Sequence, residues 1–156
     1  NRIQATNAIY DYLDGWRQQF RIGMQEKMGK DRVRYYYQLE LNNRKDRDEG
    51  TVDPFISYSP TRHSLRATGW WRLTGKWRAR LDGRYRYSRY NDENILQGNI
   101  AQRREDSQLR LSARVNRIFA RDWDVSAQFS QTKNDSNLDR KSYDRSVLSL
   151  GVSRFF

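Results

Sequence analysis

Apolar and polar residues alternate with a period of two along most of this chain. In the final segment, residues 144–156, Leu148, Leu150 and Val152 share one parity, while Ser149 and its polar neighbours occupy the other. Successive side chains of a β-strand point to opposite faces, so this period predicts a strand with one apolar and one polar face. The chain is therefore expected to be built from two-faced strands.

The same alternation predicts seven earlier strands, which makes eight in all. They cover approximately residues 1–12, 16–24, 33–41, 64–73, 77–87, 108–115 and 123–130. Short connections at 29–31, 74–76 and 117–122 alternate with longer polar ones at 42–60, 88–106 and 133–140. An even number of strands joined by alternately short and long connections is typical of an all-β, antiparallel, up-and-down transmembrane β-barrel.

The composition agrees with strands of this kind. The mean hydropathy is −1.11 and 31% of the residues are charged, yet 13% are aromatic, which is unlike a disordered chain. No run approaches the roughly 20 apolar residues of a membrane-spanning helix. Four tryptophans lie near strand ends on the apolar parity, as expected of an interfacial aromatic girdle. They are Trp16, Trp71, Trp77 and Trp123.

A water-soluble antiparallel sandwich is the alternative fold, because half-buried strands also alternate. The polar parity disfavours it, since nearly every residue there is long and charged and no strand is apolar on both faces. The two folds differ in where their apolar residues lie. Burial of Leu81, Leu111 and Leu150 in a dry interior would indicate the sandwich.

Charge and residue usage narrow the possible partners. The chain has no Cys and a single His, so neither a disulfide framework, a metal site nor a cofactor is predicted. The net charge of +11 and the isoelectric point near 10.2 indicate an anionic partner, such as lipopolysaccharide, an acidic polysaccharide or nucleic acid. Loop cations such as Arg44 and Lys45 are expected to contact lipopolysaccharide phosphates.

The polar parity of the predicted strands carries a series of arginines. If the apolar parity faces lipid, these side chains face the lumen, opposed by Glu40, Asp82 and Asp124 alone. Arginine's planar fork suits carboxylate, sulfate or phosphate, so we predict an anion-binding lumen. Its residues are Arg66, Arg78, Arg80, Arg84, Arg86, Arg110 and Arg114, and Arg17, Arg21, Arg34 and Arg72 share their parity.

An eight-stranded barrel is just wide enough to be filled by its own side chains, so this many unpaired charges would be costly. Either the lumen is wide and wet, as in a larger or oligomeric barrel, or an anionic partner occupies it. A solvated, ion-paired filling, as in a small anchoring barrel, is the alternative in which the arginines bind no substrate.

Gly151 and the terminal Phe156 resemble the C-terminal signal of bacterial outer-membrane β-barrels. Arg154 departs from that pattern, which has an apolar or aromatic residue two before the end. The resemblance implies a location in the bacterial outer membrane, recognition by the barrel-assembly machinery, and contact with membrane lipid and lipopolysaccharide.

A second resemblance covers roughly the last hundred residues. Its segments are YSPTRHSLRATGWWRLTGKWRA, YRYSRYND and NDSNLDRKSYDRSVLSLGVSRFF. They are similar to the C-terminal barrel region of outer-membrane export proteins that bear tetratricopeptide repeats. It implies export of an anionic polymer such as exopolysaccharide, and that residues 1–156 are one barrel domain or the C-terminal portion of a larger one. No binding or catalytic residue is carried over from this family.

Two other function classes are disfavoured by the residues themselves. His63 and Ser64 suggest a hydrolase, but neighbouring strand residues point to opposite faces and no G-x-S-x-G elbow is present. Asp46, Asp48 and Glu49 lie in a charged loop and are expected to be solvated. Nucleic-acid binding requires aromatic and basic residues on one face, whereas these strands separate them. We therefore predict an anion-favouring channel, with a non-conducting anchoring barrel or scaffold as the alternative and a lipid-modifying barrel enzyme ranked below both.

Overall fold

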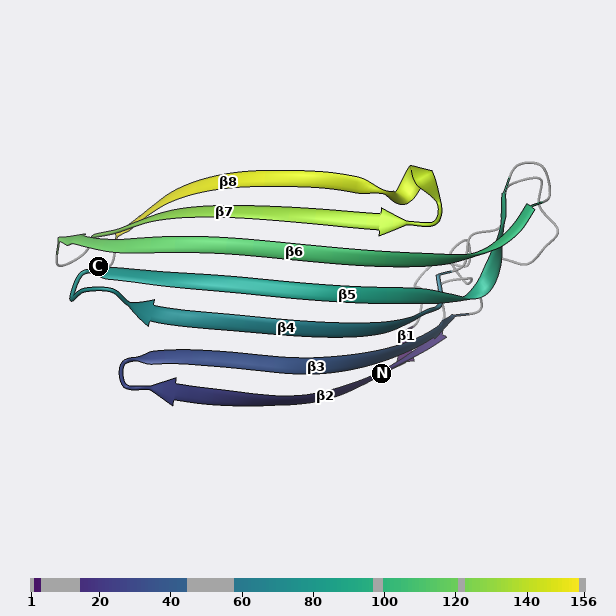
Figure 1. Ribbon diagram of the computed structural model, residues 1–156, viewed down its shortest axis with the longest axis horizontal. Coiled ribbons are helices and arrows are strands. Elements are labelled where there is room, and N and C mark those ends of the chain that lie inside the picture. Colours follow the sequence, from purple (N-terminus) through teal and green to yellow (C-terminus); the bar gives the residue numbers. More distant parts are fainter. Residues whose placement is uncertain (1, 4–14, 45–57, 97–99, 121–122, 155–156) are drawn as a thin grey trace.

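The computed structural model describes residues 2–3, 15–44, 58–96, 100–120 and 123–154, which form one antiparallel sheet (Figure 1). Each strand pairs with the next along the chain, in the order β1 to β8. The strands are β1 (Arg2–Ile3), β2 (Gly15–Met28), β3 (Asp31–Arg44), β4 (Pro60–Arg72), β5 (Trp77–Leu96), β6 (Ile100–Ala120), β7 (Trp123–Ser136) and β8 (Tyr143–Arg154). A single 3-10 turn, η2 (Asp139–Lys141), joins β7 to β8 among the described segments. The prediction of an all-β, up-and-down antiparallel fold is confirmed.

The number of strands agrees with the prediction, but the first strand differs. β1 comprises only Arg2–Ile3 and pairs with Gly15 and Trp16 of β2, while the rest of the predicted strand at 1–12 lies outside the described residues. Among the described strands, β8 pairs with β7 alone. The described sheet therefore has two edges, one at β1–β2 and one at β8.

Two of the predicted long connections are wrong. β5 continues to Leu96 and β6 begins at Ile100, so most of residues 88–106 is a paired hairpin rather than a loop. β7 likewise continues to Ser136. These extensions carry charge on both faces, as the Arg89–Glu105 ion pair at 3.4 Å illustrates, so the apolar–polar alternation that revealed the strands stops before the strands do.

The β2–β3, β4–β5 and β6–β7 connections lie at one end of the sheet and the β3–β4, β5–β6 and β7–β8 connections at the other, as Figure 1 shows. The β2–β3 turn contains Gly29 at a φ of 61°, a conformation that glycine adopts without steric cost, and the β4–β5 turn spans the residues between Arg72 and Trp77. Arg154, the last described residue, lies at this same end. We call it the short-turn end, and the other the long-connection end.

On this sheet the apolar side chains are the exposed ones and the buried side chains are mostly polar, whereas a water-soluble sheet buries its apolar side chains. Leu81 is 52% exposed and Leu111 53%, whereas the buried side chains are mostly polar and Tyr90 is the one buried hydrophobic residue among those described. The buried polar residues of the strands, such as Glu40 and Thr68, lie on the other face. We call these the apolar face and the polar face. The leucines expected in a dry interior by the sandwich alternative lie on the surface instead.

The exposed apolar residues form a band that crosses the strands obliquely. On β2 the band centres on Ile22, whose cross-strand row ends at Asp144 on β8. On β8 it centres on Leu150, six residues beyond Asp144. At about 3.3 Å per residue and about 4.8 Å between strands, the six steps from β2 to β8 incline the band by about 35°.

Trp71 folds back over Gly69 on the apolar face, so that a Cβ added at Gly69 would overlap the indole ring. Gly69→Ala is therefore expected to displace the indole and lower the free energy of unfolding by about 1–3 kcal/mol. Gly75 has open space around it, so Gly75→Ala is a matched control that changes stability by less than about 0.5 kcal/mol. Urea unfolding in detergent micelles, followed by tryptophan fluorescence, measures both. Equal stability of the two variants would contradict this packing.

Candidate anion-binding site on the polar face

Register aligns the arginines of the polar face into cross-strand rows. Arg66 on β4 lies opposite Arg84 on β5, which lies opposite Arg110 on β6, and the row continues through Thr132 to Arg145 on β8. We call these four arginines the central row. Because like charges directly opposite one another on neighbouring strands repel, the fold carries an electrostatic cost here that a bound anion or water would relieve.

A second basic row runs parallel to the first, nearer the short-turn end. It consists of Lys27, Arg32, Trp70, Arg80 and Arg114 on five successive strands. Arg80 and Arg84 are four residues apart on β5, so the rows are separated by about 13 Å along the strands. One carboxylate, that of Asp82, lies between the rows on β5.

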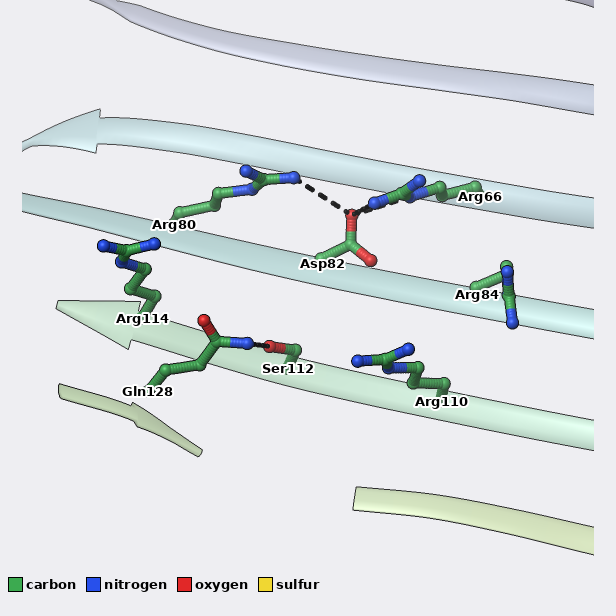
Figure 2. A pocket seen from close by; sticks show the side chains of 8 residues that line it. All are labelled: Arg66, Arg80, Asp82, Arg84, Arg110, Ser112, Arg114 and Gln128. Carbon is green, nitrogen blue, oxygen red and sulfur yellow. Dashed lines mark hydrogen bonds and ion pairs between the residues drawn. The ribbon is translucent and has the colours of Figure 1, made fainter. Parts of the chain in front are cut away.

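The two rows line a hollow of about 200 Å³ that Figure 2 shows from close by. Five guanidinium groups and one carboxylate surround it. The lining residues are Arg66, Arg80, Asp82, Arg84, Arg110, Ser112, Arg114 and Gln128. We call it the central hollow. It contains five of the seven predicted anion-binding arginines, drawn together from three strands.

Asp82 compensates only part of this charge. Its Oδ2 accepts hydrogen bonds from Arg66 Nε at 2.7 Å and Thr68 Oγ1 at 2.6 Å, and lies 3.8 Å from the Arg80 guanidinium. This part-buried carboxylate holds Arg66 and Arg80 in place (Figure 2). It is the one acidic residue lining the central hollow.

The remaining arginines of the central hollow have no acidic partner in the described part of the chain. Arg84 donates to the Gln108 side-chain oxygen at 3.2 Å, and Arg114 to that of Asn116 at 3.0 Å. Arg110 makes neither a hydrogen bond nor an ion pair with the described residues. Arg84, Arg110 and Arg114 thus present uncompensated guanidinium groups, whose forked N–H donors match planar or tetrahedral oxyanions.

Trp70 lies on the polar face among the arginines. Its ring centroid is 4.3 Å from the Arg32 guanidinium carbon, 5.4 Å from that of Arg80 and 5.7 Å from that of Arg34. Trp70 broke the alternation of its strand, and sequence reasoning left it, Lys27, Arg32 and Arg145 out of the predicted site. The register between strands identifies these residues, because it places them in the same cross-strand rows as the predicted arginines.

The other two predicted arginines lie outside the central hollow. Arg78 lines a second hollow of about 360 Å³, which shares Arg80 and Arg114 with the first. This short-turn hollow is lined by Lys30, Trp70, Trp71, Arg72, Arg78, Ala79, Arg80, Arg114, Asn116, Ile118 and Asp124. Arg86 lies on the opposite side of the central row, half-buried, and its Nε has no hydrogen-bond partner among the described residues.

Toward the long-connection end, the side chains of the polar face are buried and paired with one another. There Glu40 accepts hydrogen bonds from Gln19 Nε2 at 2.7 Å and Arg62 Nη1 at 2.8 Å, and Arg104 forms an ion pair with Asp106. Glu40 and Asp106 are each 7% exposed. Tyr90, under the Arg104 guanidinium, is also buried. We call this set of paired, buried side chains the polar collar. Asp106 was missed as a residue of the polar face because it fell in a predicted loop.

The residues considered for other chemistry are placed apart. His63 lies on the apolar face, where its Nδ1 is 2.7 Å from the Tyr37 hydroxyl, while Ser64 lies on the polar face. Within the described segments, no group of three or more acidic or histidine residues is arranged to hold a metal ion. The described residues also contain no helix long and apolar enough to cross a membrane. Asp46, Asp48, Glu49 and Lys45 lie outside the described residues.

Only part of the predicted assembly signal falls within the structure. Gly151 lies on the polar face of β8, opposite Ser126, and a Cβ there would meet Ser126 Oγ at 3.0 Å. Phe156 lies outside the described residues. Arg44, at the end of β3, donates its backbone N–H to Ser59 Oγ at the long-connection end.

Comparison with known proteins identifies no relative of this chain. No family model, curated protein or solved structure matches it. Its function is therefore argued from the geometry of the two faces.

Proposed function

We propose that this chain forms all or part of a transmembrane β-barrel in the bacterial outer membrane. The oblique apolar band supports the proposal, because large apolar side chains that are exposed on seven strands are stable in an apolar surrounding, and the inclination of about 35° is that of barrel strands. The expected partners are membrane lipid, lipopolysaccharide, the barrel-assembly machinery and the remainder of a larger barrel or other subunits.

We propose further that the polar face lines an anion-favouring passage. The observation that carries this function is the pair of basic rows with a single carboxylate between them. A ladder of guanidinium groups about 13 Å apart lowers the electrostatic barrier for an anion, and water around the hollow keeps each contact weak enough to release it. The resemblance to export proteins gives an anionic polymer such as exopolysaccharide as the substrate.

A non-conducting anchoring barrel or envelope scaffold is the second candidate, and the polar collar favours it. Glu40, Arg62, Asp106 and Tyr90 are packed and paired, as the filling of a closed barrel would be. The two candidates differ in whether ions pass.

Ion selectivity in planar bilayers tests the proposal. The reconstituted full-length protein is expected to conduct chloride in preference to potassium across a salt gradient. Replacing Arg80, Arg84 and Arg110 together with Ser is expected to move the reversal potential at least halfway toward the non-selective value, because three of the five cations of the central hollow are lost.

The matched control replaces three exposed cations away from the hollow with Ser, namely Lys133, Arg140 and Lys141. This control is expected to keep the wild-type reversal potential. A triple Arg→Ser variant with an unchanged reversal potential would contradict the lumen assignment. A protein that inserts but passes no current would favour the anchoring barrel.

A further inference from the structure

The two ends of the polar face differ in packing. At the long-connection end the polar collar is buried, with Asn42 3% and Ser88 3% exposed. At the short-turn end Arg72 and Arg78 are exposed, and the Arg78 guanidinium makes no hydrogen bond or ion pair with the described residues. The central hollow adjoins the short-turn hollow, with which it shares Arg80 and Arg114.

The two ends also differ in charge. The carboxylates of the collar, Glu40 and Asp106, are paired with Arg62 and Arg104. The short-turn hollow is lined by Lys30, Arg72, Arg78, Arg80 and Arg114 against the single carboxylate of Asp124. Positive potential is therefore concentrated at the open end and compensated at the packed end, and a charged, water-filled cleft concentrates ions of opposite sign.

We infer that the short-turn hollow is a loading site for oxyanions, which pass from it to the central row. This inference rests on the proposed function and adds a direction to it. Arg72 and Arg78 lie directly opposite each other on β4 and β5, so one ligand can contact both guanidinium groups. Arg80 and Arg114, also directly opposite, form the step between the two hollows.

The ligand class follows from these donors. Paired guanidinium forks bind carboxylate, phosphate or sulfate groups, and they provide no acceptor for a cation. A polymer carrying such groups can contact the short-turn hollow and the central row at once, because the central row lies about 20 Å beyond Arg78, six residues along β5. A mono-anion contacts one row at a time, so a polyanion is the preferred ligand.

Sided block of the ion current tests the direction of loading. The full-length protein is reconstituted in planar bilayers. The orientation of each channel is determined with the variant Asp139→Cys, which is labelled with a thiol-reactive biotin and detected by streptavidin added to one chamber. The present chain has no cysteine of its own. Dextran sulfate, polyphosphate and polygalacturonate are then added separately to either chamber, so that sulfate, phosphate and carboxylate are distinguished. Half-block is expected at a concentration about tenfold lower from the short-turn side.

The variant Arg72→Gln/Arg78→Gln is expected to remove the difference between the two sides. Arg140→Gln/Lys141→Gln deletes two charges at the long-connection end and is expected to preserve it. An anion-selective channel blocked equally from both sides, or more strongly from the long-connection side, overturns the loading site and leaves the proposed function standing. A cation-selective or non-conducting protein overturns both.

Discussion

Leu150→Arg is expected to destabilise the folded protein in lipid bilayers by about 2–4 kcal/mol, the cost of an arginine on the lipid face near the membrane midplane. Leu150 is 78% exposed and lies at the centre of the apolar band on β8. In a water-soluble sheet the same substitution on so exposed a side chain would be neutral, within about 0.5 kcal/mol. The sign and size of this one effect therefore separate a membrane sheet from a soluble one.

Ser149→Arg is the matched control, because residue 149 precedes Leu150 on the same strand and faces the polar side. It introduces the same side chain at the same depth but into the polar face, and is expected to change stability by less than about 1 kcal/mol. Folding titrations in urea with phospholipid vesicles, read by heat-modifiable migration on gels, measure both variants. Equal stability of the two would remove the membrane assignment of the apolar face.

The sequence predicted the arrangement of the faces because alternation is a local property. Leu81 and Arg80 are adjacent, and the pleat alone places them on opposite sides of β5. Strand ends were predicted poorly wherever both faces are polar. The β5–β6 hairpin continues through Glu93 and Arg103, a cross-strand pair in a stretch where the alternation of apolar and polar residues no longer marks the strands.

The sequence grouped the arginines by face but did not show how they are arranged. Even parity placed Arg66, Arg84 and Arg110 on one face of their strands, and the register places them in one row. The register also adds Arg145, which a gap at Thr132 separates from the others, and Trp70, whose aromatic side chain contradicted its parity. Pairing between strands is a long-range property, which a periodicity within one strand does not contain.

The arrangement of the carboxylates explains how the fold tolerates its basic rows. Glu40 and Asp106 are placed where the polar face is packed, so the carboxylates that lose most solvation are paired. The central hollow is left open, and water screens Arg84 and Arg110 there. Asp82 shares features of the packed region and of the open hollow, because its carboxylate is part-buried and also lines the central hollow.

Asp82→Asn is accordingly expected to have two opposite effects. The variant loses the charge-assisted hydrogen bond from Arg66 Nε and the ion pair with Arg80, so the free energy of unfolding is expected to fall by roughly 1–3 kcal/mol. Anion selectivity is expected to rise, because the central hollow keeps its five guanidinium groups and loses its one carboxylate. Urea unfolding and bilayer reversal potentials measure the two quantities on the same preparation.

Asp135→Asn is the control, because this carboxylate is exposed, lies on β7 outside the hollow and pairs only with Lys133 at 3.6 Å. It is expected to change neither stability nor selectivity measurably, since exposed ion pairs contribute about 0–1 kcal/mol. A loss of stability at Asp82 without a gain in anion selectivity would show that the carboxylate merely holds Arg66 and Arg80. The path of the ions would then lie too far from Asp82 for its charge to affect selectivity. The basic rows would keep the polar face hydrated rather than guide anions.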